Sequence, residues 1–83
     1  MTTEASKKLQ MLMAQEMGPM GAFIIKKQCD NLGLITDELK VSDLPRLSKA
    51  LYEAIFVFTG EEKGKRIVEE IRKIGFEVGG AKE

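Results

Sequence analysis

The sequence predicts an all-α protein, a compact bundle or an orthogonal array of about four helices. Apolar residues recur at steps of three and four in four segments, as they do along one face of a helix. The connections between these segments are short, and glycine or proline stands at the boundaries. Because 83 residues leave no room for a second folding unit, we expect one domain over residues 1–83.

The first helix is expected over residues 3–17, which are good helix formers. Thr2 or Thr3 is the expected N-cap. Gly18 and Pro19 end this helix, because proline lacks an amide hydrogen and disfavours helical geometry in the residue before it. Its apolar face consists of Leu9, Leu12, Met13, Met17 and Met20.

The second helix is expected from about Pro19 to Leu32, and Gly33 is placed to end it in a left-handed conformation. Two glycines, Gly18 and Gly21, lie near its start. We favour a role in the turn for both over a close approach of two backbones. The predicted apolar face consists of Ala22, Ile25, Cys29 and Leu32.

Residues 34–42 give the weakest pattern in the chain. We expect an ordered connection with one short helical turn, opened by Thr36 or Asp37 and running through Leu39. An extended segment at residues 39–41 is the alternative.

The third helix, over residues 43–60, is expected to be central because it is the longest strongly apolar segment. Ser42 or Asp43 is its expected N-cap, Pro45 suits its first turn, and Gly60 marks its end. One face carries Leu44, Leu47, Leu51, Ala54, Ile55 and Phe58.

The last helix is expected to start at a capping box formed by Thr59 and Glu62 and to end at Gly75. Phe76 is expected to fold back onto its last turn. The tail after about residue 76 is predicted to be frayed, and a short strand at residues 76–78 is the alternative. The buried stripe consists of Ile67, Val68, Ile71 and Ile74.

The charge balance argues against a nucleic-acid partner, because 13 basic and 13 acidic residues cancel. Basic residues do cluster in the last helix, but they alternate with glutamates at spacings that pair them locally. A solvated, ion-paired helix face explains this pattern better than phosphate contacts do. Weak nucleic-acid binding is kept as a second alternative.

The residue types also argue against an enzyme. The chain has no histidine, the commonest general base and transition-metal ligand, and its single cysteine, Cys29, lies on an apolar helix face. We therefore expect a non-enzymatic protein with a buried, inert thiol and no cofactor. Neither a signal peptide nor a membrane-spanning segment is apparent, so we expect a cytoplasmic protein with no membrane partner.

Divalent-cation or small-ligand binding is the first functional alternative. Its candidate oxygen ligands are Asp30, Asn31, Asp37 and Glu38, but their spacing is not that of a calcium loop. Ordinary polarity at a helix end and a turn is the simpler interpretation.

The strongest functional signal is an excess of apolar residues. Beyond the predicted stripes, further methionine, aromatic and aliphatic residues supply more apolar surface than four short helices need to bury. We therefore predict a protein–protein interaction or assembly module that self-associates, as a homodimer, or docks a partner beside the central helix. The interface candidates are Met13, Met17, Phe23, Tyr52 and Phe56.

Residues 18–33 and 42–73 resemble a helical module found in small archaeal proteins and some signalling proteins. In that module a Gly-Pro pair opens one helix, a Leu-Gly pair closes it, and an Asp-Leu-Pro-x-Leu segment opens the next. The matching residues here are Gly18 with Pro19, Leu32 with Gly33, and Asp43 to Leu47. The resemblance covers about residues 9–74. It implies a helical fold, but no activity and no site residues.

Overall fold

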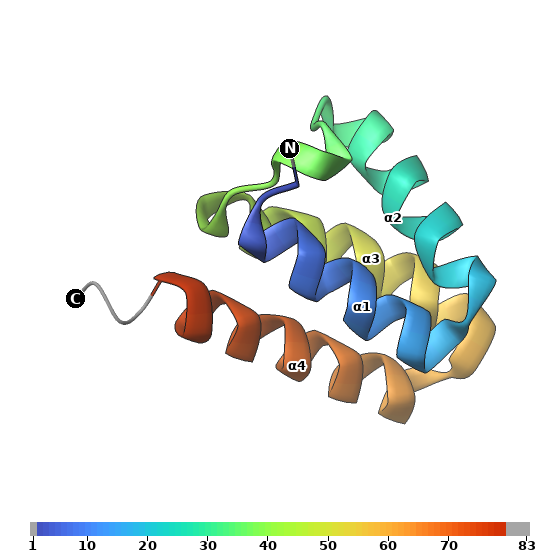
Figure 1. Cartoon of the computed structure of the whole chain (residues 1–83). Coiled ribbons are helices and arrows are strands. Elements are labelled where there is room, and N and C mark those ends of the chain that lie inside the picture. The colour runs from blue at the N-terminus through green and yellow to red at the C-terminus, as the bar shows by residue number, and fades with distance from the viewer. Residues whose placement is uncertain (1, 80–83) are drawn as a thin grey trace.

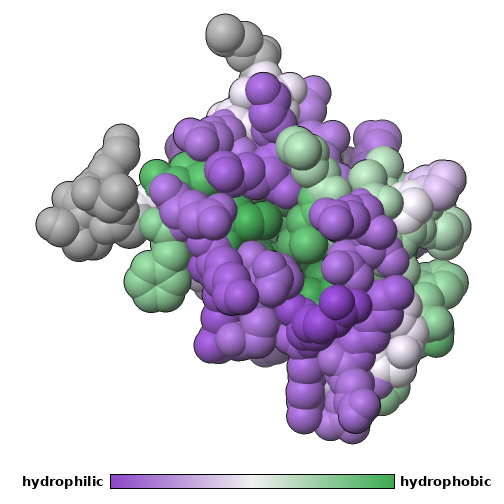
Figure 2. Space-filling view, turned by 60° about the horizontal axis from the view of Figure 1, so that its bottom comes forward, coloured by the Kyte–Doolittle hydropathy of each residue, from purple (hydrophilic) through white to green (hydrophobic). Residues whose placement is uncertain are grey.

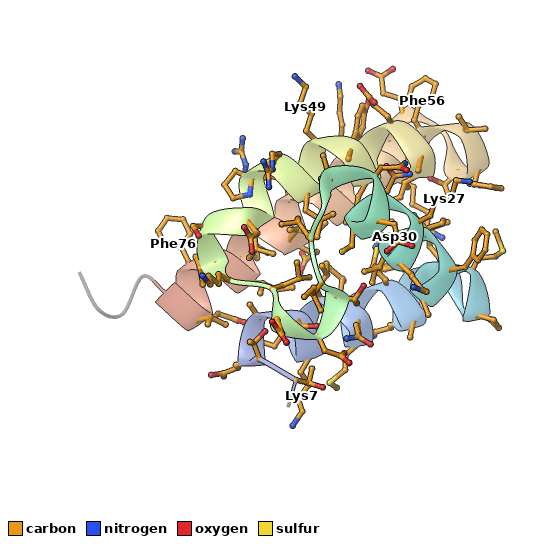
Figure 3. The ribbon with its side chains drawn as sticks, turned by 90° about the horizontal axis from the view of Figure 1, so that it is seen from above. Lys7, Lys27, Asp30, Lys49, Phe56 and Phe76 are labelled. Carbon is orange, nitrogen blue, oxygen red and sulfur yellow. The ribbon has the colours of Figure 1, made fainter. Side chains whose placement is uncertain are left out.

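Four α-helices make up most of residues 2–79, the part of the chain that the computed structural model describes (Figure 1). The elements are α1 (Glu4–Met17), α2 (Pro19–Leu32), two short 3-10 helices η1 (Thr36–Glu38) and η2 (Val41–Asp43), α3 (Leu44–Thr59) and α4 (Glu61–Gly79). Successive α-helices reverse direction, and α2 is inclined to α1 and α3 (Figure 3). Each α-helix packs against the next, and α1 also packs against α4. The predicted all-α fold is confirmed as a four-helix bundle.

The core draws on all four helices and on the connection between α2 and α3. Its fully or almost fully buried apolar residues are Leu9, Met13, Ile24, Ile25, Cys29, Leu39, Leu44, Leu47, Leu51, Ile55, Ile67, Ile71 and Ile74. Burying one side chain of this size contributes about 1.5–3 kcal/mol. The central stripe predicted for α3 is therefore correct from Leu44 to Ile55.

Three residues assigned to buried faces lie outside instead. Phe58 is 60% exposed and Met20 is 41% exposed, and Ala22 is also exposed. Phe58 lies in the last turn of α3, beside Val57, which is even more exposed. The spacing of apolar residues along one helix does not show where the neighbouring helices end, so it does not show which of these residues are covered.

The turn between α1 and α2 brings two backbones very close together. Gly18 makes the turn with a φ of 62°, as expected, but Gly21 is helical and buried. A Cβ added to Gly21 would overlap the carbonyl group of Met13 on α1, lying 2.6 Å from its carbon. The turn role favoured for Gly21 was therefore wrong, and its missing side chain allows the close approach. This approach also fixes the rotation of α2, so that Ile24 rather than Ala22 faces inward.

Polar side chains at and near the start of α1 form hydrogen bonds with the connection between α2 and α3. Thr3 is the N-cap of α1, and its hydroxyl also donates to the carbonyl of Leu39, 2.6 Å away. The fully buried Ser6 donates to the carbonyl of Thr36 and accepts from Gln10 at 2.8 Å. The predicted helical turn is present as η1 but ends at Glu38, and Leu39 and Lys40, between η1 and η2, are extended. Leu39 thereby reaches the core, which its sequence position did not indicate.

Asp43 lies at the N-cap position of α3, one of the two residues predicted there, but its side chain does not cap the helix. Pro45 does lie in its first turn, as predicted, but Asp43 already has helical backbone angles and makes no side-chain cap bond to α3. The Asp43 carboxylate instead accepts from the Lys40 amide at 3.0 Å, closing η2. Because η2 directly precedes α3, the Asp43 carboxylate accepts from the Lys40 amide rather than from an amide of α3.

Both predicted ends of α4 were wrong. Thr59 is the last residue of α3, where its hydroxyl donates to the carbonyl of Ile55 at 3.0 Å, so it forms no capping box with Glu62. Gly60, with a φ of 89°, makes the whole turn by itself.

At its other end α4 continues through Gly75 to Gly79, and residues 76–78 are neither frayed nor a strand. An interior glycine costs a helix only about 1 kcal/mol. Here Val78 packs against the core, and Lys8 pairs with Glu77 at 3.5 Å. The rest of the predicted frayed tail, residues 80–83, lies outside the described residues.

Candidate interaction surfaces

Eight large apolar side chains are exposed on the described part of the chain. They are Met11, Met20, Phe23, Ile35, Phe56, Val57, Phe58 and Phe76. They do not form one patch, because Phe56 and Phe76 project at opposite ends of the molecule (Figure 3). Figure 2 shows a face on which polar side chains predominate and apolar ones form a sunken strip. The exposed apolar surface is therefore divided among several places.

The five predicted interface residues fall into three groups. Phe23 and Phe56 are 62% and 46% exposed, and Met17 and Tyr52 are half-buried. Met13 is fully buried in the core, so its assignment to a surface was wrong. Its place four residues after Leu9 on the α1 stripe was the signal that it packs inside.

Two of these candidates, Tyr52 and Phe56, have rings in contact with one another. The rings of Tyr52 and Phe56, one helical turn apart on α3, meet edge to face with centroids 5.9 Å apart. Phe23 lies on α2, where it borders a small hollow of about 320 Å3 with Lys26, Lys27 and polar neighbours. Figure 3 shows Lys27 and Asp30 in this part of α2.

A concave feature lies between α3 and α4, and we call it the α3/α4 groove. Its volume is about 1140 Å3. From the η2 and α3 side it is lined by Val41, Ser42, Leu44, Pro45, Ser48, Lys49 and Tyr52, and from the α4 side by Val68, Ile71, Arg72, Gly75, Phe76 and Gly79. Tyr52 therefore connects the predicted Tyr52–Phe56 pair to this groove.

Glycines on α4 give the groove its depth. A Cβ added to Gly75 would meet Leu44 Cδ1 at 3.8 Å, an ordinary contact, and one added to Gly79 would lie 3.0 Å from Val41 Cγ1. Gly64 lies beneath the ring of Tyr52, where an added Cβ would come within 3.1 Å. The sequence interpretation missed the groove because it treated Gly75 as a helix end.

Charged side chains stand on both walls of the groove. Lys49 comes from α3 and Arg72 from α4, and no carboxylate is among the described residues that line it. Arg72 pairs with Glu69 at 3.4 Å, but both side chains are largely exposed, so water weakens this pair. The groove thus combines an apolar floor with positive charge on both sides.

Outside the groove, the described residues give little support for a reactive thiol or a cation site. Burial raises the pKa of the Cys29 thiol, which disfavours the reactive thiolate. Among the proposed cation ligands, Asp37 accepts from Gln10 at 3.3 Å and Asp30 pairs with Lys26 at 3.5 Å. Within residues 2–79, acidic and cysteine side chains form no group of three or more suited to a metal ion.

The basic residues of α4 are paired partly as predicted. Lys65 pairs with Glu61 at 2.9 Å, whereas Arg66 reaches across to Glu16 of α1 at the same distance. The spacing along α4 predicted that Arg66 pairs with Glu62, four residues before it, but Arg66 pairs with a residue of another helix instead.

None of the helices within residues 2–79 is both long enough and apolar enough to span a membrane. Comparisons with protein-family models, with curated proteins and with solved structures found no match. The resemblance to a helical module of small archaeal proteins therefore stays a prediction.

Proposed function

We propose that this protein is a cytoplasmic, non-enzymatic interaction module that self-associates or docks a partner helix beside α3. The observation that supports it best is the α3/α4 groove, because an open apolar groove between two helices suits a further helix. The exposed Phe56, in edge-to-face contact with Tyr52 next to the groove, extends the apolar surface. Aromatic residues of this kind are frequent anchors of interfaces.

The first experiment is a light-scattering measurement of the solution mass over a hundredfold range of concentration. We expect a mass above that of the monomer at the highest concentrations. A monomer at every concentration would exclude self-association and leave only the docking of a partner.

A matched pair of variants tests whether the predicted residues carry the association. Phe56→Lys is expected to give a folded monomer, because it places a charge beside Tyr52. Val57→Lys is the control, since Val57 is the next residue of α3 and 78% exposed. Equal masses for the two variants would contradict a role for Phe56, and unfolding of Phe56→Lys, read by circular dichroism, would make it a core residue.

Cation binding and weak nucleic-acid binding remain the alternatives. A cation that binds the folded state must raise the melting temperature, so thermal melts with calcium or magnesium test the first. Strongly salt-dependent retention on DNA or RNA tests the second.

A further inference from the structure

We infer that the α3/α4 groove receives an acidic amphipathic helix of a partner protein, about three turns long. This inference rests on the proposed function and names the partner's chemistry. It depends on the length of the groove, the residues of its floor and the charges on its walls.

The length of the groove matches a short helix. Leu44, Ser48 and Tyr52 follow one another at four-residue steps along α3, so this wall is about 12 Å long at 1.5 Å per residue. The α4 wall runs from Val68 to Gly79, or about 16 Å. Two to three turns of a helix span this distance, enough to present apolar side chains at positions i, i+4 and i+7.

The floor and the ends of the groove suit the apolar face of such a helix. Leu44, Val68 and Ile71 line it along its length, with Tyr52 and Phe76 as aromatic residues. Phe76 is 76% exposed, so an occupant would cover a large apolar side chain that now faces water. Figure 3 shows Phe76 projecting from the end of α4 beside the start of α3.

The charges on the walls of the groove indicate the charge that the partner helix carries. Lys49 projects outward from α3, and among the described residues it makes no ion pair (Figure 3). Arg72 stands on the opposite wall, where its exposed pair with Glu69 is weak enough to exchange for a partner carboxylate. A helix lying between them therefore gains from acidic residues on both flanks of its apolar stripe.

A second copy of this chain fits less well. Its exposed Phe23 is bordered by Lys26, which pairs with Asp30, and by Lys27, which forms no ion pair among the described residues, so α2 would still bring a positive charge to a positive rim. Charge complementarity favours a different protein with acidic flanks.

The test uses the full chain, labelled with 15N, and three synthetic 14-residue helical peptides. All three carry the same leucine stripe, and their flanking positions hold glutamate, glutamine or lysine. We expect the glutamate peptide to shift the amide signals of groove residues such as Val68 and Gly75. At low salt we expect it to bind about tenfold more tightly than the glutamine peptide, with the lysine peptide weakest and the preference shrinking as salt is added.

Charge-reversal variants provide the control. The double variant Lys49→Glu with Arg72→Glu is expected to prefer the lysine peptide, while Lys27→Glu, which changes a lysine outside the groove, keeps the original preference. Both are checked for an unchanged helical spectrum. If the double variant does not fold, the salt dependence and the ranking of the three peptides still decide the question.

Four results of the titrations would overturn the inference, and so would a fifth result from the free protein. The four are no shifts with any peptide, shifts outside the groove, equal affinity for the glutamate and glutamine peptides, or groove shifts with palmitate but not with the glutamate peptide. Groove shifts that appear only as the free protein is concentrated would instead make a second copy the occupant. That last result would overturn the inference while supporting the proposed function, so the two fail separately.

Discussion

The two helical hairpins of this protein are joined alike but packed differently. A single glycine makes each turn, Gly18 between α1 and α2 and Gly60 between α3 and α4. In the first hairpin, Gly21 then meets the backbone of Met13, whereas in the second, Gly75 meets only side-chain methyl groups at ordinary distances. Gly64 of the second hairpin is also closely packed, since an added Cβ would lie 3.1 Å from the Tyr52 ring, so the second hairpin is open only farther along, at Gly75.

The hairpins also differ in how polar groups hold them. The α1/α2 hairpin is tied to the connection after it by Thr3, Ser6 and Gln10. The outer side of the α3/α4 hairpin carries the open groove instead. The first hairpin is thus hydrogen-bonded to the α2–α3 connection, while the outer side of the second is left as an open groove.

Gly21→Ala should have the largest effect of the changes considered. The added methyl group overlaps the Met13 carbonyl, so α2 must move away from α1, and we expect a loss of about 2–3 kcal/mol in the free energy of unfolding. Urea denaturation measures it. No loss, or the small gain expected of an ordinary glycine-to-alanine change inside a helix, would break the contrast between the hairpins.

Ser6→Ala should follow, with a loss of about 1–2 kcal/mol. The change removes the donor to the carbonyl of Thr36 and the acceptor of Gln10 in a fully buried position. Ser42→Ala, at an exposed serine, is the matched control. Equal denaturation midpoints for the two variants would show that this bond does not hold the connection.

Gly75→Ala should act in the opposite direction to Gly21→Ala. Gly75 lies inside α4, its φ is not positive, and the new methyl group meets Leu44 at 3.8 Å. We therefore expect a gain of about 0.5–1 kcal/mol from the lower conformational freedom of the unfolded chain. Destabilisation here would mean that the α3/α4 hairpin is as tightly closed as the other.

The smallest effect is expected at the exposed pair of Glu61 and Lys65 at the start of α4. The hydrogen bond and charge of Lys65 lower the pKa of the Glu61 carboxyl. Because the folded-state pKa lies below the ordinary value of 4.5, the contribution is present above that pH and is lost as the pH falls through the folded-state pKa. Lys65→Met should lower the melting temperature slightly at pH 7 and not at pH 2. An equal shift at both pH values would assign the effect to something other than this pair.

The sequence predicted most of the elements because their signals are local. Helical spacing placed Leu47 and Leu51 in the core, and Pro19 and Gly33 marked the ends of α2 as expected. The errors at Asp43, Thr59 and Gly75 share one cause, since each residue has a local preference that neighbouring structure overrides. A nearer hydrogen-bond partner or a packed last turn outweighs a preference of about 1 kcal/mol.

The candidate site was predictable only in part. An apolar surface beside the central helix was expected, and Tyr52 and Phe56 do lie together there, but the groove and its positive walls were not foreseen. Lys49 and Arg72 are 23 positions apart, and no local pattern says that they face one another across a gap. The sequence by itself determined the four helices and the inward faces of their central turns, because periodicity acts within one helix. Only the tertiary structure decided how closely the helices approach, and hence which glycine is buried and which lines a groove, because that distance depends on what the opposite helix presents.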